Sequence, residues 1–475
     1  MTSDYNPQHV SRNLAGRTIA AVLSTITIVV GVVVSASGLA AGIIRSLDGP
    51  SPSLPVVEVL PAEPDTLLVC MGPGLSFGSA SSEPVAYGEP TEVVAGVNPV
   101  TFTLDDTTVL DGFSLEGAVS TTYPGVITQA FEDGPLAAVS FQSLSNLNVR
   151  GLAVAECQEP RVETWIVGGD TSTGRQAALS LSNPGDVPAT VNIDIWGASG
   201  PISSSLGQGI LVQPGAQRVL PLAGLAPSEP SPVIRITADT GGIVAALHAS
   251  IVRGLTADGL SVVTGQPVPS TKRVVPGVFL APEDLLGPIK GKEGYADVGA
   301  ALRILSPEGD TTAEVTIVRS GEESTSTRLD LVAGQVKDLI LDELGSGDVA
   351  VFVESEAPIV AGVRQSVGND QATDTSWLGT SYPLLGEAAV AVPPIGDSRI
   401  TFANPGDASV AVNFDGRDLE VPAGGIVTRP LADSHRIVAP STVYAAVSVR
   451  SDTVIGNLQV LPTRPAQESV RVTVR

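Results

Sequence analysis

The sequence predicts an all-β protein: tandem immunoglobulin-like β-sandwiches preceded by one N-terminal transmembrane helix. Short runs rich in Val, Ile, Leu and Thr alternate with clusters of Gly, Pro, Asn and Asp along most of the chain, a spacing typical of sandwiches and barrels. A block of about 100 residues occurs in three copies, and about 100 residues is the size of one such sandwich. A single long apolar tract without charge lies close to the N-terminus.

The apolar tract, residues 18–44, predicts a transmembrane helix. No charged residue lies between Arg17 and Arg45, and a helix of that length crosses a hydrocarbon core of ~30 Å. Because Arg12 and Arg17 precede the tract, we expect residues 1–17 to form a cytoplasmic head and the bulk to lie outside the cytoplasm, in a single-pass protein of the cell membrane. A cleavable signal peptide is the alternative, since small residues at 35–42 offer cleavage sites. Both alternatives export the same domains.

The charge balance excludes one class of partner. The chain has 26 Lys+Arg against 50 Asp+Glu, a formal net charge of −24. A surface of this sign repels phosphate backbones, so no nucleic-acid partner is expected.

The two cysteines, Cys70 and Cys157, both follow the apolar tract. An even number of cysteines in an oxidising compartment favours a disulfide between them. Two buried thiols are the alternative.

Residues 45–64 are expected to form a linker, because their prolines disfavour helix and favour extended backbone. An N-terminal β domain follows at 65–160, with strands expected at 100–104 and 137–141. Three repeat units then follow, and we place them at 161–268, 269–375 and 376–475.

The repeat is defined by four elements that keep their order. The first is a strand that ends in Asn183-Pro184-Gly185-Asp186, recurs at 400–407 and recurs more loosely at 302–310. Pro followed by Gly predicts a type II turn with positive φ at the glycine. The second is a strand whose alternation of apolar and polar residues predicts half burial, at 191–195, 315–317 and 410–414. The third is a turn that leads into another strand, at 212–220, 332–339 and 421–429. The fourth element is predicted to be a hairpin, at 234–247, 349–363 and 444–458, and residues 281–297 are predicted to be a loop inserted into the second unit.

No motif specifies catalysis, a metal or a cofactor. His248 and His435 occupy non-equivalent places and lack ligand partners at short spacing. Gly74-x-Ser76-x-Gly78 matches a nucleophile-elbow pattern without the preceding strand and following helix that it needs. Three acids near Gly112 (Asp105, Asp106 and Asp111) lack calcium-loop spacing, so solvated hairpin acids are the favoured interpretation.

The three tryptophans, Trp165, Trp196 and Trp377, allow two interpretations. They are of the type that stacks on sugars, but two of them lie near the start of a unit and the third at a strand end. Packing at the junctions between units is therefore favoured.

The segment 157–200 resembles a known family. It contains Cys157-x-x-Pro160, Trp165, Gly168-Gly169, Gly174-Arg175 and Leu179-x-Leu181-x-Asn183-Pro184, and Leu68-Val69-Cys70 precedes it. This pattern resembles actinobacterial membrane-anchored exported proteins of unknown function. Met71 departs from it, since proline is expected there. The resemblance implies an N-terminal anchor, a β-rich exported body and a high-GC Gram-positive source, but no activity.

These observations favour a non-catalytic, membrane-anchored structural or interaction protein of the cell envelope, with an unknown envelope protein or glycan as its partner and the membrane bound through its N-terminal helix. Stacked sandwiches on the linker would form a rod. The alternative is carbohydrate binding or processing in an acidic cleft between units. A convergent pair of acids beside an exposed tryptophan would favour the alternative, and buried tryptophans would favour the interaction protein.

Overall fold

The computed structural model describes residues 56–59, 66–71, 74–77, 84–86, 92–97, 100–103, 114–115, 125–129, 134–145, 149–369, 372–463 and 470–473. The predicted head at 1–17 and the predicted transmembrane helix at 18–44 lie outside these residues. In the described ranges, no helix combines the length and the apolar character that crossing a membrane requires. The chain divides into two units, Met1–Ala62 with Ala466–Arg475, and Glu63–Pro465, which we call the body.

The first unit contains an antiparallel strand pair. β1 (Val56–Val59) pairs with β34 (Val470–Thr473). β1 lies within residues 45–64, which we predicted to be a linker with extended backbone. Three of its four residues are valine, whose branched side chain favours extended strands.

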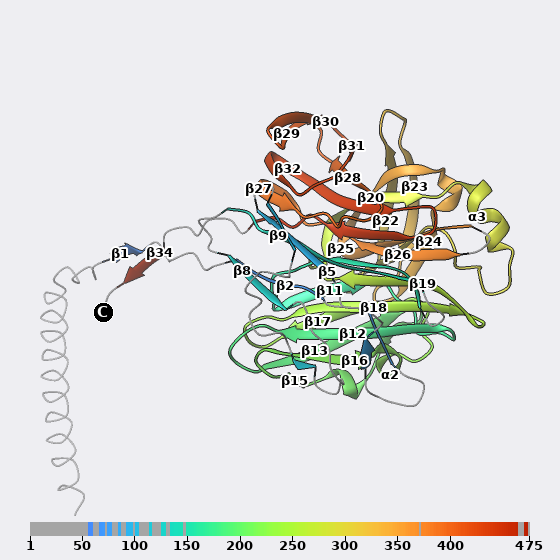
Figure 1. Cartoon of the computed structure of the whole chain (residues 1–475), viewed down its shortest axis with the longest axis horizontal. Helices are drawn as coiled ribbons and strands as arrows, with labels where there is room; N and C mark the ends of the chain where they lie inside the picture. The colour runs from blue at the N-terminus through green and yellow to red at the C-terminus, as the bar shows by residue number, and fades with distance from the viewer. Residues whose placement is uncertain are drawn as a thin grey trace, which may run out of the picture. The chain divides into compact units, whose positions relative to one another are not determined.

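The body is all-β, as predicted (Figure 1), and module 2 (Ser270–Gly379) shows its plan most clearly. Its two antiparallel sheets have the strand orders β20-β25-β22-β23 and β26-β25-β21-β24, because β25 is long enough to take part in both. The strands are β20 (Ser270–Leu280), β21 (Ala301–Leu305), β22 (Thr311–Arg319), β23 (Thr325–Leu331), β24 (Val336–Ile340), β25 (Gly347–Gly368) and β26 (Thr373–Gly379).

Module 3 (Leu384–Gln459) repeats this plan strand for strand. Its sheets have the orders β27-β32-β29-β30 and β33-β32-β28-β31, and β32 again joins the two. The strands are β27 (Leu384–Val390), β28 (Asp397–Asn404), β29 (Val410–Phe414), β30 (Arg417–Val421), β31 (Gly425–Pro430), β32 (His435–Arg450) and β33 (Ile455–Gln459).

Module 1 (Glu163–Thr264) has the same plan with the joining strand broken in two. Its sheets have the orders β11-β17-β13-β14, with β15 also on β13, and β19-β18-β12-β16. β17 and β18 occupy the places of the two halves of β25. The strands are β11 (Glu163–Val167), β12 (Arg175–Asn183), β13 (Ala189–Gly197), β14 (Gly200–Ile202), β15 (Ile210–Val212), β16 (Ala216–Pro221), β17 (Val233–Ala238), β18 (Val244–Arg253) and β19 (Thr256–Thr264).

The N-terminal module repeats parts of this plan in its described strands. The pair β2–β8 matches β11–β17, and the order β10-β9-β5 matches β19-β18-β12. Further pairs are β5–β6, β3–β4 and the parallel pair β7–β16. The strands are β2 (Thr66–Val69), β3 (Leu75–Phe77), β4 (Pro84–Ala86), β5 (Glu92–Val97), β6 (Val100–Thr103), β7 (Ser114–Leu115), β8 (Val126–Gln129), β9 (Ala137–Ser145) and β10 (Arg150–Glu156).

The strand order differs from the immunoglobulin arrangement that we predicted. An immunoglobulin domain separates strands ABED from CFG, so that its sixth and seventh strands form a hairpin in one sheet. Here the predicted hairpin at 349–363 is part of the single strand β25, whose residues 347–359 lie in one sheet and 360–368 in the other. The predicted hairpin at 444–458 is real, but it pairs β32 with β33 and so corresponds to β25–β26. The boundary at 375/376 falls inside β26.

The repeated Asn-Pro-Gly-Asp turn also differs from the type II turn that we predicted. Gly185 and Gly406 are not among the glycines with positive φ, so the turn is not type II. Instead, the Asn183 side-chain oxygen accepts the Gly185 N–H at 3.0 Å, and Asn404 accepts from Gly406 at the same distance. The asparagine itself forms the turn, as Asn commonly does two residues before the donor. The strand-and-turn likeness of the two copies therefore extends to matching hydrogen bonds.

The segment predicted to be a loop at 281–297 contains helix α3 (Glu283–Lys290). Two acids in its first turn and Lys290 in its last complement the helix dipole, and Leu286 and Ile289 are buried. In the part of the chain that the structure describes, the other short helices are α2 (Leu222–Leu225), η2 (Ser205–Gly207) and η3 (Asp342–Leu344).

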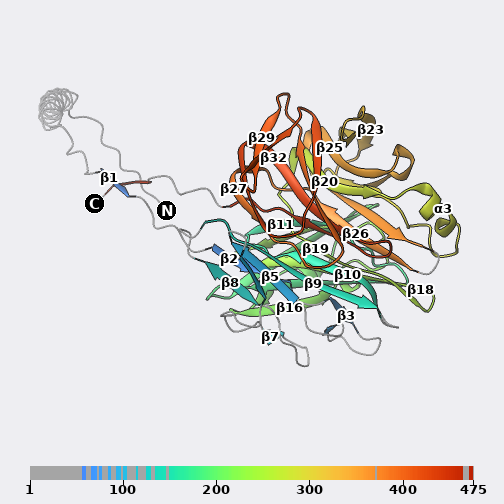
Figure 2. The ribbon, with the colours of Figure 1, turned by 45° about the horizontal axis from the view of Figure 1, so that its top comes forward.

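The modules meet along their last strands. β10 contacts β19 and β33, and β26 contacts the same two strands, so the four strands close a ring. Figure 2 shows β10, β19 and β26 close together in the middle of the body. Within the body the modules therefore converge on one centre, and the rod of successive sandwiches that we expected is wrong.

Candidate functional site

A disulfide joins Cys70 and Cys157, and the two Cα atoms are 4.2 Å apart. Both cysteines are buried beside Leu68 and Ala138. Cys70 follows β2 and Cys157 follows β10, so the bond ties the first described strand of the body to one of its central strands.

Removing the disulfide is expected to destabilise the protein without changing its fold. The bond spans a sequence separation of 87 residues, for which the chain-entropy model gives at most ~4–5 kcal/mol. We expect the double variant Cys70→Ser/Cys157→Ser to lower the midpoint of urea unfolding, and dithiothreitol to lower that of the wild type but not that of the variant. Two titratable thiols in denatured, unreduced wild-type protein would contradict the bond.

The centre of the body contains a buried carboxylate, Asp374 on β26. Its side-chain oxygens accept the backbone N–H groups of Leu152 at 3.0 Å, of Leu260 and Ile455 at 3.1 Å each, and of its neighbour Thr375 at 2.9 Å. One side chain thus links β26 to β10, β19 and β33. Burial raises the pKa of Asp374 to about 8, and the four N–H donors oppose that rise because they favour the charged form.

A second polar cluster lies further along the same strands. Glu156 on β10 accepts hydrogen bonds from Thr264, from Gln158 at 2.8 Å and from the backbone of Gln459 at 3.1 Å. Burial raises the pKa of Glu156. Gln266 accepts from the backbone and the side chain of Thr380 at 2.6 and 2.7 Å. Together with Asp374 of module 2, Glu156 and its partners connect all four modules, which makes the polar centre a joint between modules.

The buried carboxylate predicts a pH dependence. Between pH 6.5 and 8, Asp374 is ionised in the unfolded chain but retains its proton for part of the folded population, so unfolding releases a proton. The free energy of unfolding should therefore fall as the pH rises through this window. Burial lowers the pKa of His248 to about 4, whereas its unfolded pKa is about 6.5. Its opposing contribution therefore fades as the pH rises through the window, and the slope of Asp374 is clearest between about pH 7.5 and 8. Melting temperatures across the window test this, and an equal slope in Asp374→Asn would contradict it.

The histidines are placed apart. His248 is buried, and its Nε2 lies 3.1 Å from Ser180 Oγ, whereas His435 lies beside Phe414 and 3.5 Å from Asp415. Among the described residues, no group of three or more His, Cys, Asp and Glu is placed to hold a metal. Ser76 lies within strand β3 rather than on a strand-to-helix turn, and the three acids near Gly112 lie outside the described residues.

The tryptophans pack between modules 1 and 2. Trp165 and Trp196 stack with ring centroids 5.2 Å apart, and they cluster with Leu305, Val336 and Val360 of module 2. Trp377 belongs to module 2 but packs into the core of module 1. Trp165 is 2% exposed and Trp377 7%, so neither presents its ring to solvent.

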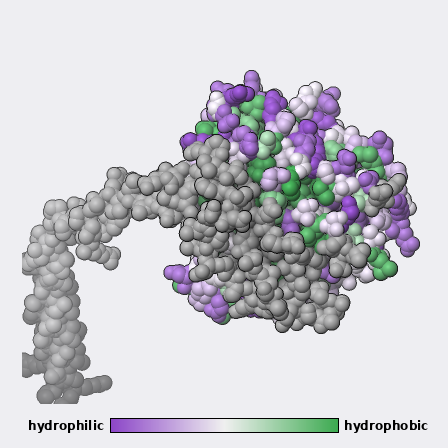
Figure 3. Space-filling model, in the orientation of Figure 1, coloured by the Kyte–Doolittle hydropathy of each residue, from purple (hydrophilic) through white to green (hydrophobic). Residues whose placement is uncertain are grey.

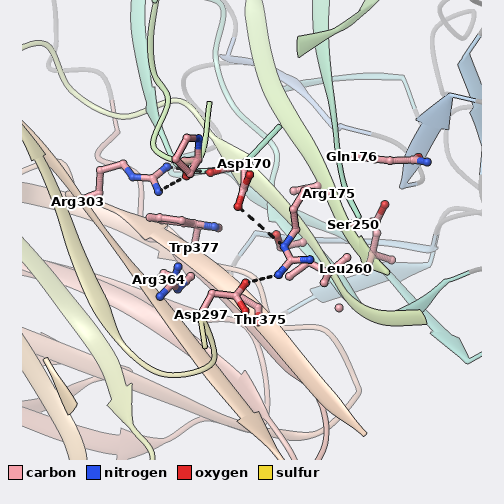
Figure 4. A pocket seen from close by; sticks show the side chains of 16 residues that line it. Asp170, Arg175, Gln176, Ser250, Leu260, Asp297, Arg303, Arg364, Thr375 and Trp377 are labelled. Carbon is pink, nitrogen blue, oxygen red and sulfur yellow. Dashed lines mark hydrogen bonds and ion pairs between the residues drawn. The ribbon is translucent and has the colours of Figure 1, made fainter. Parts of the chain in front are cut away.

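A small pocket lies at the same junction (Figure 4). Arg175 on β12 donates to Asp297 at 2.7 Å and lies 3.9 Å from Asp170. Arg303 on β21 lies over the Trp377 ring at 4.4 Å, with Arg364 at 6.0 Å from the same ring. In a protein that has almost twice as many acids as bases, three arginines line one pocket.

A larger pocket lies between modules 2 and 3. Its volume is about 230 Å³, and its lining includes Phe279, Asp397, Arg450 and Asp452. Arg450 stacks on Phe279 at 4.0 Å and donates to Asp348. Asp397 is exposed and paired with Arg399 at 3.1 Å.

The polar centre and the arginines were not predicted from the sequence. Asp374 lies in the polar run Thr373-Asp374-Thr375-Ser376 near the end of the second unit. That run is the one sequence signal for a polar joint. Arg303 stands between Leu302 and Ile304, and Arg364 stands between Val363 and Gln365, so neither gives such a signal.

Comparison with known proteins gives a family but no activity. A search of curated proteins finds no match. Among solved structures, a chain described as "Crystal Structure of Thermotoga maritima 1070" is similar with 15% identity and a TM-score of 0.21, covering 24% of this chain and 97% of that one. The model of a family of unknown function, DUF5719, matches residues 117–423, and the chain therefore belongs to that family.

Proposed function

We propose that this chain is a non-catalytic protein of the cell envelope, attached to the membrane by residues 18–44, whose extracytoplasmic body binds another envelope component. The observation that carries the proposal is that the buried carboxylates bind other modules of the same chain. Asp374 and Glu156 accept hydrogen bonds from neighbouring modules, so both carboxylates are engaged in holding the body together.

Three further features support this function. A disulfide suits an oxidising compartment outside the cytoplasm. Two of the tryptophans that would stack on a sugar are buried at a module junction. The resemblance of residues 157–200 to actinobacterial anchored proteins favours the same location and a similar source.

The described surface of the body combines exposed apolar side chains with polar ones. Figure 3 shows hydrophobic residues in several groups among hydrophilic ones on one face. Large exposed apolar side chains occur on different modules, namely Leu206, Leu255, Leu285, Ile340 and Leu385. We therefore expect binding to use a mixed surface, as transient interfaces do.

Location and binding are tested separately. In intact cells, protease added outside should degrade the body while a tag on residues 1–17 stays protected, and the protein should remain with the membrane after carbonate extraction. A mature N-terminus within residues 35–43 would show that this segment is a cleaved signal peptide and not an anchor. Degradation of the tag with the body intact would overturn the proposed topology.

Cross-linking in cells tests binding. With an inert secreted protein of equal abundance as control, it should recover the same envelope partner reproducibly.

Carbohydrate binding between modules 2 and 3 is the second candidate. The pocket of about 230 Å³ is somewhat smaller than the ~300–1,000 Å³ of common ligand pockets, but its lining by Asp397, Asp452 and Phe279 has the mixed character of a sugar site. If it is one, Asp452→Asn should weaken binding of purified cell-wall polysaccharide to the full chain. Asp433→Asn, which removes an exposed carboxylate that is not part of this lining, should not. Equal polysaccharide binding by both variants and the wild type would count against this candidate.

A further inference from the structure

The pocket between modules 2 and 3 has an apolar wall on the side of module 2. Phe279, Ala281, Leu285 and Val367 line it there. Val367 is buried, whereas Leu285 on α3 is 52% exposed, so the apolar wall extends from buried residues to the surface. Such a wall offers few hydrogen-bonding groups and therefore suits an apolar part of a ligand.

Module 3 lines the same pocket with charged residues, and the acids among them exceed the bases. Arg450 is the base in this lining, and it already donates to Asp348 of module 2 at 3.1 Å. Asp397 is paired with Arg399 at 3.1 Å. Asp452 is exposed, and no ion pair among the described residues involves it. The lining therefore contains a carboxylate whose negative charge is not balanced by a paired base.

The volume of the pocket limits the size of its occupant. It is about 230 Å³, which exceeds the ~150 Å³ of a cavity that holds benzene but is less than the ~300–1,000 Å³ of common ligand pockets. One long amino-acid side chain fits this space, whereas an oligosaccharide does not.

A lysine side chain combines the features that this lining favours. Its methylene groups can cover apolar surface while the ammonium at its end stays close to water. The ammonium is a compact cation, which matches a single exposed carboxylate. The chain has a formal net charge of −24, so its overall charge also favours the approach of a basic partner.

We propose that the pocket between modules 2 and 3 receives a lysine side chain of a partner protein, with the methylene groups against Leu285 and Val367 and the ammonium paired with Asp452. This inference rests on the proposed function, because it names the chemistry of the envelope component that the body binds. It gives the pocket a different occupant from the sugar of the second candidate, and the same experiment separates the two.

Saturation-transfer NMR with the full chain in detergent tests the site. The probe is a pentapeptide with blocked ends and one central lysine between glycines. The control probe carries Nε-acetyl-lysine instead, which keeps the methylene groups and removes the charge. We expect saturation transfer to the lysine methylene protons, and at least about threefold weaker binding of the acetylated peptide, since a partly exposed ion pair is lost.

Two variants and two matched controls locate the binding. Asp452→Asn and Leu285→Ser should each weaken binding of the lysine peptide by at least about threefold. The controls Asp433→Asn and Leu385→Ser change an exposed acid and an exposed leucine outside this lining, and should bind as the wild type does. Because Asp452→Asn and Asp433→Asn alter the net charge equally, a difference between them cannot come from net charge.

Equal binding of the two peptides by the wild type, or equal binding of the lysine peptide by Asp452→Asn and Asp433→Asn, would overturn the proposal. Binding of purified cell-wall polysaccharide that depends on Asp452, without saturation transfer to the lysine peptide, would overturn it too and assign the pocket to a sugar. If the lysine peptide binds as expected but cross-linking in cells recovers no partner, the pocket assignment stands and the proposed function fails.

Discussion

Replacing Asp374 with alanine is expected to lower the free energy of unfolding by at least about 4 kcal/mol, or to prevent folding altogether. Four backbone N–H groups, from four central strands, would lose their acceptor in the buried centre, and each buried group left unpaired costs ~1–3 kcal/mol. Typical total stabilities are only ~5–15 kcal/mol. Urea unfolding of the full chain, followed by tryptophan fluorescence, measures the loss.

Two further variants separate hydrogen bonding from general damage. Asp374→Asn keeps one oxygen as acceptor but turns an amide N–H₂ toward the other donors, so it should be destabilised less than the alanine variant. The control Asp452→Asn removes an exposed carboxylate and should change the free energy of unfolding by less than about 0.5 kcal/mol. Near-equal stability of Asp374→Ala and the control would show that the centre does not depend on this carboxylate.

The features that could be predicted from the sequence are local ones. Alternating apolar residues in strands such as Val191, Ile193 and Ile195 follow from the pleat of a half-buried strand, and the observed burial alternates in the same way. The Asn-Pro-Gly-Asp turn of modules 1 and 3 could be recognised because an asparagine that forms its own turn leaves a short, repeated pattern. These signals are carried by neighbours in the chain.

The features that escaped prediction depend on contacts between distant residues. Whether residues 347–368 form a hairpin or one strand depends on which sheet accepts each half, and both halves have the same apolar alternation. The ring of β10, β19, β26 and β33 joins residues up to about 300 positions apart, as the bond from Gln459 to Glu156 does. Gly151 is a further example: a Cβ there would lie 2.5 Å from Asp374 Oδ1 and from Leu260 N, so the glycine follows from an approach that only the folded centre reveals.

The junction between modules 1 and 2 should depend on Arg303 more than on any surface base. Arg303 is 1% exposed, and it donates to Asp338 of its own module and to the Gly169, Pro230 and Pro232 carbonyls of module 1. Removing one member of a buried ionic network leaves the others unpaired, which costs ~3–5 kcal/mol. We expect Arg303→Ala to lose that much stability and to shift the fluorescence of Trp377, whose ring lies 4.4 Å from the guanidinium.

Lysine at position 303 distinguishes charge from geometry. It keeps the positive charge beside Asp338 but lacks the planar fork that reaches several carbonyls at once, so Arg303→Lys should recover only a minor part of the stability lost in Arg303→Ala. The control Arg417→Ala removes an exposed arginine on β30 and should stay within about 0.5 kcal/mol of the wild type. Full recovery by lysine would mean that the charge alone holds the junction. The carbonyls of module 1 converge on the Arg303 side chain of module 2. We therefore expect the planar guanidinium group, with its several N–H donors, to determine how the two modules are joined.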